Sequence, residues 1–180
     1  MYKRQIWYNE PKTLDVAFDV IGDIVLSAAS QQYGGFTVPS VDLILEPYAQ
    51  KSFDRDMKKY LALGVPEEKA EEVAYADVVK EMEQGFQGWE YKFNTVASSR
   101  GDYPFITVTA GTGTGRFAKL ATVSMLKVRR EGQGKDGFRK PVLFPKIVFL
   151  YDENLHGPGK PLEDVFEEGV RCSAKTMYPD

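Results

Sequence analysis

Two short stretches of this chain carry residues that could bind a phosphate or a nucleotide. The first is the turn at residues 111–116 (GTGTGR), between a predicted strand and a predicted helix. Backbone N–H groups and the helix dipole favour an anion at such a junction. The turn lacks both the Gly-Lys-Ser/Thr ending of a P-loop and the glycine spacing of a dinucleotide fingerprint. It is either a plain tight connection or a phosphate contact within a larger site, through Gly111, Thr112 and Gly113.

The second stretch, residues 94–105 (NTVASSRGDYPF), joins a predicted long helix to a predicted strand. It combines hydroxyls, an amide and an arginine, which are the groups that bind phosphate or ribose. Polar loops of this composition are also commonly only solvated, so the residues alone leave both interpretations open. The candidates for an effector or substrate contact are Asn94, Ser98, Ser99, Arg100 and Gly101.

The other reactive side chains favour structural roles. His156 lies beside a Gly-Pro-Gly sequence without a second histidine, which predicts a surface histidine and no metal site. Cys172, the single cysteine, follows Val165 by seven residues on a predicted helix, which predicts a packed thiol. The basic run at residues 127–140 predicts a solvated helix end. With no nucleophile–base pair and no carboxylate dyad in the pattern, we expect no catalytic residue and no bound metal.

Composition indicates one globular domain of 180 residues, with 43% hydrophobic and 27% charged residues. The formal net charge of −3 gives no reason to expect a nucleic-acid polymer as partner. No apolar run approaches the roughly 18 residues of a transmembrane helix. A single cysteine excludes an internal disulfide. We therefore expect a cytoplasmic protein that does not span a membrane.

Apolar periodicity predicts a helical first half and an alternating second half. Helices are expected over residues 13–32, 46–63, 66–96, 116–130 and from 162 onward, and strands over 105–110 and 142–150. The stretch 36–45 is either a loop or a short strand. Gly85 and Gly88 suggest that another backbone packs closely against the long helix. The strand–helix–strand–helix order predicts parallel strands, and the apolar run 142–150 predicts a strand covered on both faces.

The two ends of the chain predict a truncated protein. Residues 1–5 (MYKRQ) are the translation of GTG-TAT-AAG-AGA-CAG with GTG as start codon, which is the end of a transposase adapter used in sequencing. We expect these five residues to be non-native and to make no core contacts. The chain then stops directly after a helical pattern. Most of the sheet to which the predicted strands belong is therefore expected outside residues 6–180.

An ordered set of stretches resembles the anaerobic, glycyl-radical (class III) ribonucleoside-triphosphate reductases. The matching stretches are LDVA at 14–17, QYGG at 32–35, VPSVD at 38–42, LEPY at 45–48, FNT at 93–95, SRG at 99–101, PF at 104–105, VLFPKIVF at 142–149 and CSAKTMYPD at 172–180. They follow the order of the family and cover most of residues 12–180. The resemblance identifies the chain as an internal fragment of such an enzyme.

This resemblance implies an α/β fold that is part of a ten-stranded α/β barrel, built by a homodimer of longer chains. Residues 6–97 would form the helical effector and dimer region, and residues 98–180 a β-α-β-α portion of the barrel. The family reduces ribonucleotides to 2′-deoxyribonucleotides with a glycyl radical, installed by an activating enzyme that uses S-adenosylmethionine and an iron–sulfur cluster. The radical glycine, the thiyl-forming cysteine and the structural zinc would lie outside this segment, so the fragment alone is expected to be inactive.

The resemblance also implies a regulatory role. In this family ATP or a deoxynucleotide effector binds at helices near the dimer interface, which correspond to residues 12–32 and 66–96. The loop at residues 98–104 resembles the element that links effector to substrate, although many relatives carry a longer Gly-Ala-Gln-type stretch there. Two other function classes fit the residues alone, namely a stand-alone nucleotide- or phosphate-binding module and a helical interaction protein.

Overall fold

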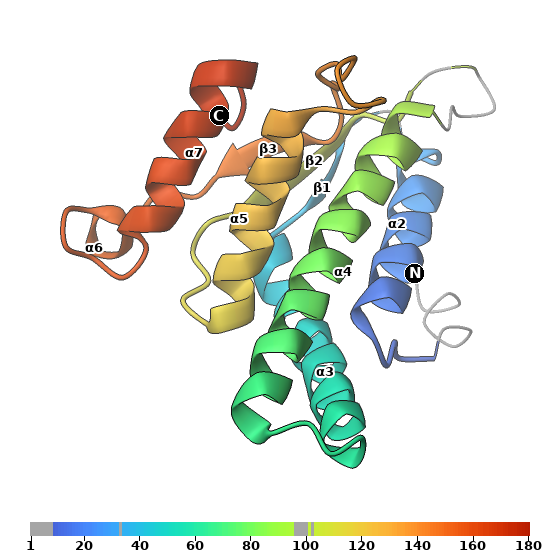
Figure 1. Cartoon of the computed structure of the whole chain (residues 1–180). Helices are drawn as coiled ribbons and strands as arrows, with labels where there is room; N and C mark the ends of the chain where they lie inside the picture. The colour runs from blue at the N-terminus through green and yellow to red at the C-terminus, as the bar shows by residue number, and fades with distance from the viewer. Residues whose placement is uncertain (1–8, 33, 96–100, 102) are drawn as a thin grey trace.

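A three-stranded parallel sheet with helices against it organises the chain (Figure 1). The computed structural model describes residues 9–32, 34–95, 101 and 103–180. The elements are α2 (Leu14–Ala29), β1 (Phe36–Val38), α3 (Val41–Ala62), α4 (Glu67–Thr95), β2 (Ile106–Ala110), α5 (Arg116–Glu131), β3 (Lys146–Phe149), α6 (Glu153–His156) and α7 (Glu163–Thr176). The strand order is β1-β2-β3. The expected α/β class and the parallel pairing are confirmed, whereas the closed barrel remains an expectation.

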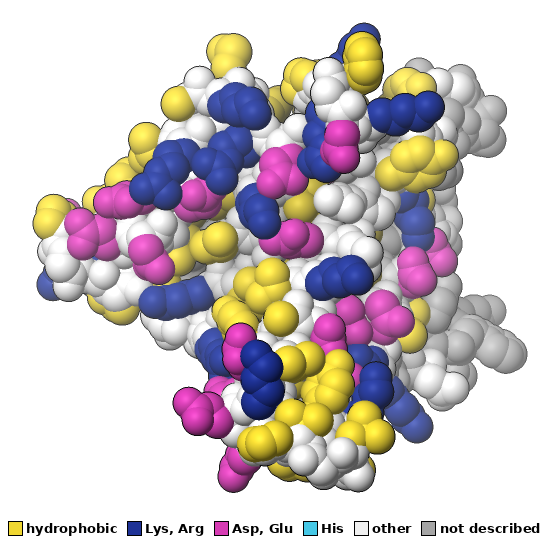
Figure 2. All heavy atoms as spheres, in the orientation of Figure 1, with side chains coloured by type: hydrophobic (Ala, Val, Ile, Leu, Met, Phe, Trp, Pro, Cys, Tyr) yellow, Lys and Arg dark blue, Asp and Glu magenta, His cyan; other side chains and the backbone are white. Residues whose placement is uncertain are grey.

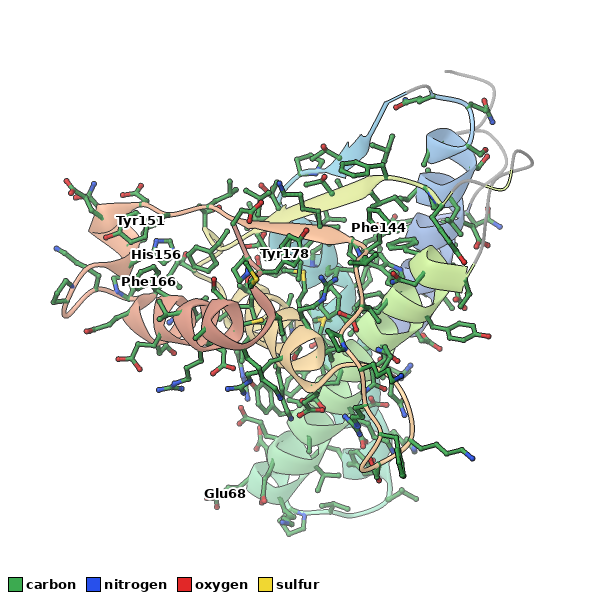
Figure 3. All side chains as sticks on the ribbon, turned by 90° about the horizontal axis from the view of Figure 1, so that it is seen from above. Glu68, Phe144, Tyr151, His156, Phe166 and Tyr178 are labelled. Carbon is green, nitrogen blue, oxygen red and sulfur yellow. The ribbon has the colours of Figure 1, made fainter. Side chains whose placement is uncertain are left out.

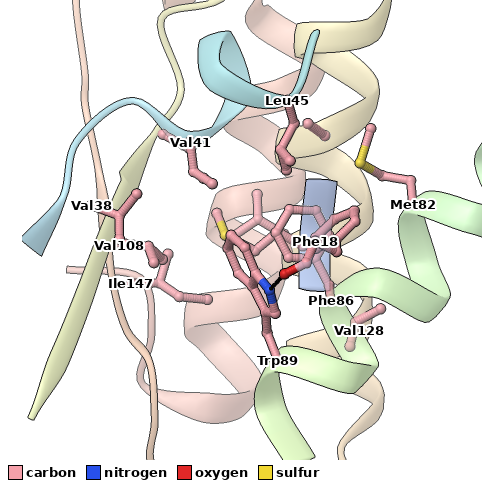
Figure 4. Packing of buried hydrophobic residues seen from close by; sticks show 14 of the residues in the cluster. Phe18, Val38, Val41, Leu45, Met82, Phe86, Trp89, Val108, Val128 and Ile147 are labelled. Carbon is pink, nitrogen blue, oxygen red and sulfur yellow. Dashed lines mark hydrogen bonds between the residues drawn. The ribbon is translucent and has the colours of Figure 1, made fainter. Parts of the chain in front are cut away.

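The helices cover one face of the sheet. On that face Val38, Val108 and Ile147 lie side by side in register and are buried, because α4 and α5 lie in front of the strands in Figure 1. The adjoining apolar cluster is filled from α3 and α4 by side chains such as Leu45 and Phe86 (Figure 4). The opposite face is more open, because every side chain on it is half-buried or exposed.

Helix α4 matches its predicted span of 66–96 closely. It begins directly after Pro66, with Glu67 and Glu68 in its first turn, as the helix dipole favours. Its apolar positions recur near the helical period and are buried against α2, α3 and α5. The close approach expected at Gly85 is real, although the neighbour is the Phe18 ring rather than a backbone. At Gly88 the expectation is wrong, because a Cβ there would meet nothing within 4 Å among the described residues.

Helix α3 begins five residues earlier than predicted. Pro47 suggested a start near Glu46, since proline removes a backbone hydrogen bond in a helix interior. The helix instead starts at Val41 and contains Pro47. Val41 and Leu45 are fully buried in the cluster, so tertiary packing holds the extra turn despite the proline.

The sheet differs from its prediction in two places. The short strand, one of the two alternatives for residues 36–45, is confirmed as β1, so the described residues contribute three strands. Strand β3 is confined to Lys146–Phe149, and Leu143 before it is 69% exposed. Only Ile147 of β3 is buried, so the predicted covering of both faces is wrong for the described residues. The short helix α6 lies between the strand and the last helix that the sequence predicts, where no element was expected.

The helical side has a mixed surface. Acidic and basic side chains are interspersed over the helices in Figure 2, as on a solvated outer wall. None of the helices within the described ranges is long and apolar enough to cross a membrane.

Candidate functional site

The described members of the two groups of sequence candidates lie at opposite ends of strand β2. The glycine turn follows Ala110 at the carboxyl end of β2, where open parallel sheets commonly bind ligands. The polar stretch 94–105 precedes Ile106 at the amino end. Five strand residues separate them, which is roughly 17 Å at about 3.3 Å per residue. The structure therefore does not bring the described members of the two groups, which in the second group are Asn94 and Gly101, together into one site.

The glycine turn is already occupied by a carboxylate of the chain itself. Asp42, fully buried in the first turn of α3, accepts hydrogen bonds through Oδ2 from Gly111 N–H (3.1 Å) and Gly113 N–H (2.9 Å). The Glu46 carboxylate lies against Gly115 at the start of α5. A Cβ added to Gly115 would lie 1.7 Å from Glu46 Oε1. Two carboxylates thus stand where an external anion would bind. These contacts favour the tight connection over a phosphate site at Gly111, Thr112 and Gly113.

His156 holds the same turn from the other side. Its ring is 2% exposed, and Nε2 donates to the Gly111 carbonyl oxygen at 2.7 Å while Nδ1 accepts from Asp152 N–H at 3.0 Å. Tyr151 and Phe166 lie beside it (Figure 3). The predicted surface histidine is therefore wrong, because helix α6 turns the ring inward. The Gly-Pro-Gly sequence suggested an exposed loop, and local sequence gave no sign of α6.

Of the loop candidates, Ser98, Ser99 and Arg100 lie outside the described residues. Gly101 is described, is exposed and has φ +83°. Their expected contact with a nucleotide stays a prediction.

Asn94 has a clear structural role. Its Nδ2 donates to the carbonyl oxygens of Glu90 and Phe144, each at 2.6 Å. Its Oδ1 accepts from the N–H groups of Leu143 (3.3 Å) and Phe144 (3.1 Å). All four hydrogen-bonding positions of the amide are thereby used within the chain. Asn94 ties the end of α4 to the segment that enters β3.

A buried ion pair next to Asn94 was missed in the sequence. Arg129 of α5 donates from Nε to Glu90 Oε1 at 2.7 Å, and the two side chains are 0% and 5% exposed. The solvated helix end predicted for the basic run is therefore wrong at Arg129. The signal that could have found it is its position four residues after Met125, on the buried stripe of α5.

The more open face of the sheet carries a row of polar side chains that sequence reasoning also missed. Thr37, Thr107 and Lys146 are in register across the three strands, on the face opposite the buried row. The Lys146 ammonium pairs with the Asp180 carboxylate at 2.5 Å, and this hydrogen bond raises the pKa of Lys146. An ammonium group and two hydroxyls on one face of a sheet are groups that can position an anionic or hydroxylated ligand.

The thiol of Cys172 has a structural role. The thiol is fully buried, and its burial raises the pKa of Cys172, so the protonated form dominates at neutral pH. The packed thiol expected from the sequence is confirmed. Across the described ranges, no group of three or more His, Cys, Asp or Glu side chains could hold a metal ion.

We expect Cys172 to be inert in the folded chain. An aromatic disulfide reagent should leave the native protein unmodified and should label one thiol per chain after unfolding in denaturant, because only the thiolate reacts and the folded environment disfavours it. The measurement is the release of the coloured leaving group with time. Stoichiometric labelling of native chain at the rate seen in denaturant would contradict the buried position.

Comparison with known proteins identifies the family. The family model described as anaerobic ribonucleoside-triphosphate reductase matches residues 2–180. Proteins of that name are similar to this chain in Haemophilus influenzae (36% identical over 171 residues), Escherichia coli K12 (35% over 171) and Enterobacteria phage T4 (35% over 172). Each alignment covers 94% of this chain but only 24%, 24% and 28% of the respective relative. The chain thus spans about a quarter of the length of these relatives.

Proposed function

Because this chain belongs to the anaerobic ribonucleoside-triphosphate reductase family, we propose that it supplies barrel wall and regulatory helices to an enzyme that reduces ribonucleotides to 2′-deoxyribonucleotides. The family match across residues 2–180 is the observation that carries this proposal. The glycyl radical, its S-adenosylmethionine- and iron–sulfur-dependent activating enzyme and the structural zinc belong to other parts of the system. The one cysteine of the segment, Cys172, is a buried thiol, so the segment alone has no reductase activity. The enzyme works in the cytoplasm.

The sheet supports the proposal that this segment is part of a ten-stranded barrel. Helices lie against one face, and the face with Thr37, Thr107 and Lys146 is left more open. Asp180 N–H donates to Ile147 O (3.1 Å), and Phe149 N–H donates to Asp180 O (2.8 Å). This is the pattern of a parallel ladder, so a further strand adds beside β3. In a closed barrel the more open face becomes the interior, where the ribonucleotide substrate lies.

An apolar stripe on α2 supports the homodimer. Val16 (44% exposed), Val20 and Ile24 (39% exposed) recur every four residues on the side of α2 away from the core. Apolar side chains at this spacing are typical of a helix that packs on a partner helix. A second copy covers this stripe, and ATP or a deoxynucleotide effector binds near α2 and α4.

The effector role is tested at Arg100, whose planar fork can hold a phosphate or a base edge where lysine could not. In the full-length reductase that contains this segment, Arg100→Ala should reduce the effector-dependent change in base preference more than it reduces basal turnover. Such couplings are typically about 5- to 150-fold. The measurement is product formation from competing ribonucleotides with each effector in turn.

Arg139→Ala is the matched control, because Arg139 is an arginine whose partners are Glu131 and Asp136 on the surface. It should leave base selection intact. Unaltered base selection by every effector in the Arg100→Ala enzyme would refute the assignment of this loop.

A further inference from the structure

Helix α4 is connected to the entrance of strand β3 by buried polar contacts. We call Glu90, Asn94, Arg129 and Gln133 the polar brace. Arg129 donates to Glu90 from Nε and to the Pro145 carbonyl oxygen from Nη2, each at 2.7 Å. Gln133 donates from Nε2 to the second oxygen of Glu90 at 2.9 Å. The brace therefore joins α4, the end of α5 and the residue that precedes β3.

The geometry of the Arg129–Glu90 ion pair matters more than its contribution to stability. Burying an ion pair costs desolvation that its attraction offsets only when hydrogen bonds are well placed, so such pairs are weak evidence for stability. Loss of one partner is nevertheless costly, because it leaves a buried charge without its counterion. The Arg129 guanidinium is planar and contacts α4 and Pro145 with different nitrogens. A displacement of α4 is therefore passed to Pro145 through one rigid group.

Asn94 makes the second connection one turn further along α4. It contacts the N–H of Leu143 and both backbone groups of Phe144. With Pro145 O bound by Arg129, four backbone groups of the three residues before β3 are held by side chains from α4 and α5. The next residue is Lys146, which opens β3 on the more open face of the sheet.

The brace also lies beside the segment 178–180, whose last residue pairs with β3. The Arg129 guanidinium lies 5.8 Å from the centre of the Tyr178 ring, and Phe144 and Tyr178 both lie near β3 in Figure 3. Tyr178 precedes Asp180, whose backbone pairs with β3 and whose carboxylate pairs with Lys146. The residue that pairs with both β3 and Lys146 thus lies two positions after a ring beside Arg129.

We infer that the polar brace transmits displacements of the α4 end to β3 and Lys146, as a second route beside the loop at residues 98–104 that enters β2. This inference rests on the proposed effector role of α4. Arg129 is a positioning residue in this route, since it acts on Lys146 through the backbone of Pro145.

The test compares Arg129→Lys with Lys127→Gln. Lysine keeps the charge that pairs with Glu90 but lacks the fork that also reaches Pro145. Lys127 joins the same two helices through Glu83 at 2.6 Å, at a site separate from the brace, so it is the matched control. Gln133→Met removes the second hydrogen bond to Glu90 and so loosens the carboxylate that positions Arg129; it serves if Arg129→Lys fails to fold.

Two measurements separate the brace from the effector site itself. In the 180-residue chain, hydrogen exchange across residues 143–150 should lose protection in the brace variants and keep it in Lys127→Gln. In the full-length reductase, the effector-dependent change in base preference should fall roughly 2- to 30-fold in the brace variants, with unchanged effector affinity.

The outcomes distinguish the two proposals. Two results in the brace variants would overturn the brace and leave the proposed function intact. One is unchanged protection of residues 143–150 from hydrogen exchange. The other is an unchanged effect of the effector on base preference, provided that the wild-type enzyme responds to the effector. A wild-type enzyme whose base choice ignored every effector would overturn the effector role and the brace together.

Discussion

Phe18→Ala should lower the free energy of unfolding of this chain by about 3–5 kcal/mol, the usual cost of truncating a buried phenylalanine. Phe18 is 3% exposed and meets the rings of Phe86 and Trp89 edge-on, each at 5.0 Å between centroids. Its backbone carbonyl accepts a hydrogen bond from Trp89 Nε1 at 2.8 Å (Figure 4). The ring therefore anchors α2 to α4. Urea denaturation of the 180-residue chain, followed by circular dichroism, measures the loss.

Gly85 and Gly88 provide a matched internal control. A Cβ on Gly85 would lie 2.2 Å from the Phe18 ring. Gly85→Ala should therefore lower the free energy of unfolding by about 1–3 kcal/mol through overpacking. This net loss remains after the gain of about 1 kcal/mol that alanine gives in helix propensity. Gly88→Ala meets open space among the described residues and should stabilise by about 1 kcal/mol. In the Phe18→Ala background, Gly85→Ala should become stabilising. Equal effects of both alanines in the wild-type background would show that Phe18 does not contact Gly85.

The long helices were predictable because their signals are local. The 3.6-residue recurrence in α4, together with Pro66 and two glutamates at its start, indicates both its existence and its bounds within one residue. Strand β1 was harder, since three residues carry almost no periodic signal. Its pairing depends on β2, whose Ile106 is the partner of Phe36 some 70 positions away in sequence.

The candidate site was less predictable, because its contacts join residues distant in sequence. The composition of the glycine turn suggested an anion site, but the anion it meets is Asp42, which precedes Gly111 by 69 positions. Arg129 was interpreted by its charge, although its place on the buried stripe of α5 required a partner such as Glu90. Family resemblance identified the enzyme class without resolving any of these contacts.

Asp42→Ala should lower the free energy of unfolding by about 2–5 kcal/mol. The N–H groups of Gly111 and Gly113 each donate a buried hydrogen bond to Asp42. A buried donor left without a partner costs about 1–3 kcal/mol. Asp42→Asn keeps an acceptor oxygen of the same shape and should cost less than half as much. Urea denaturation of the three chains gives the comparison, and an Asp42→Ala chain as stable as wild type would show that the turn does not need this carboxylate.

The same variant tests whether the turn can bind an external anion once its internal one is removed. The N–H groups of Gly111 and Gly113 and the amino end of α5 would then have lost Asp42 as their negative partner, which favours a bound anion. Sulfate should therefore raise the melting temperature of Asp42→Ala more than that of wild type, in excess of the general stabilisation that sulfate gives any protein. Glu46 stays beside Gly115 and opposes such binding, so Asp42→Ala with Glu46→Gln should show the larger shift. Identical sulfate responses in all these chains would mean that the turn is only a tight connection, with or without Asp42.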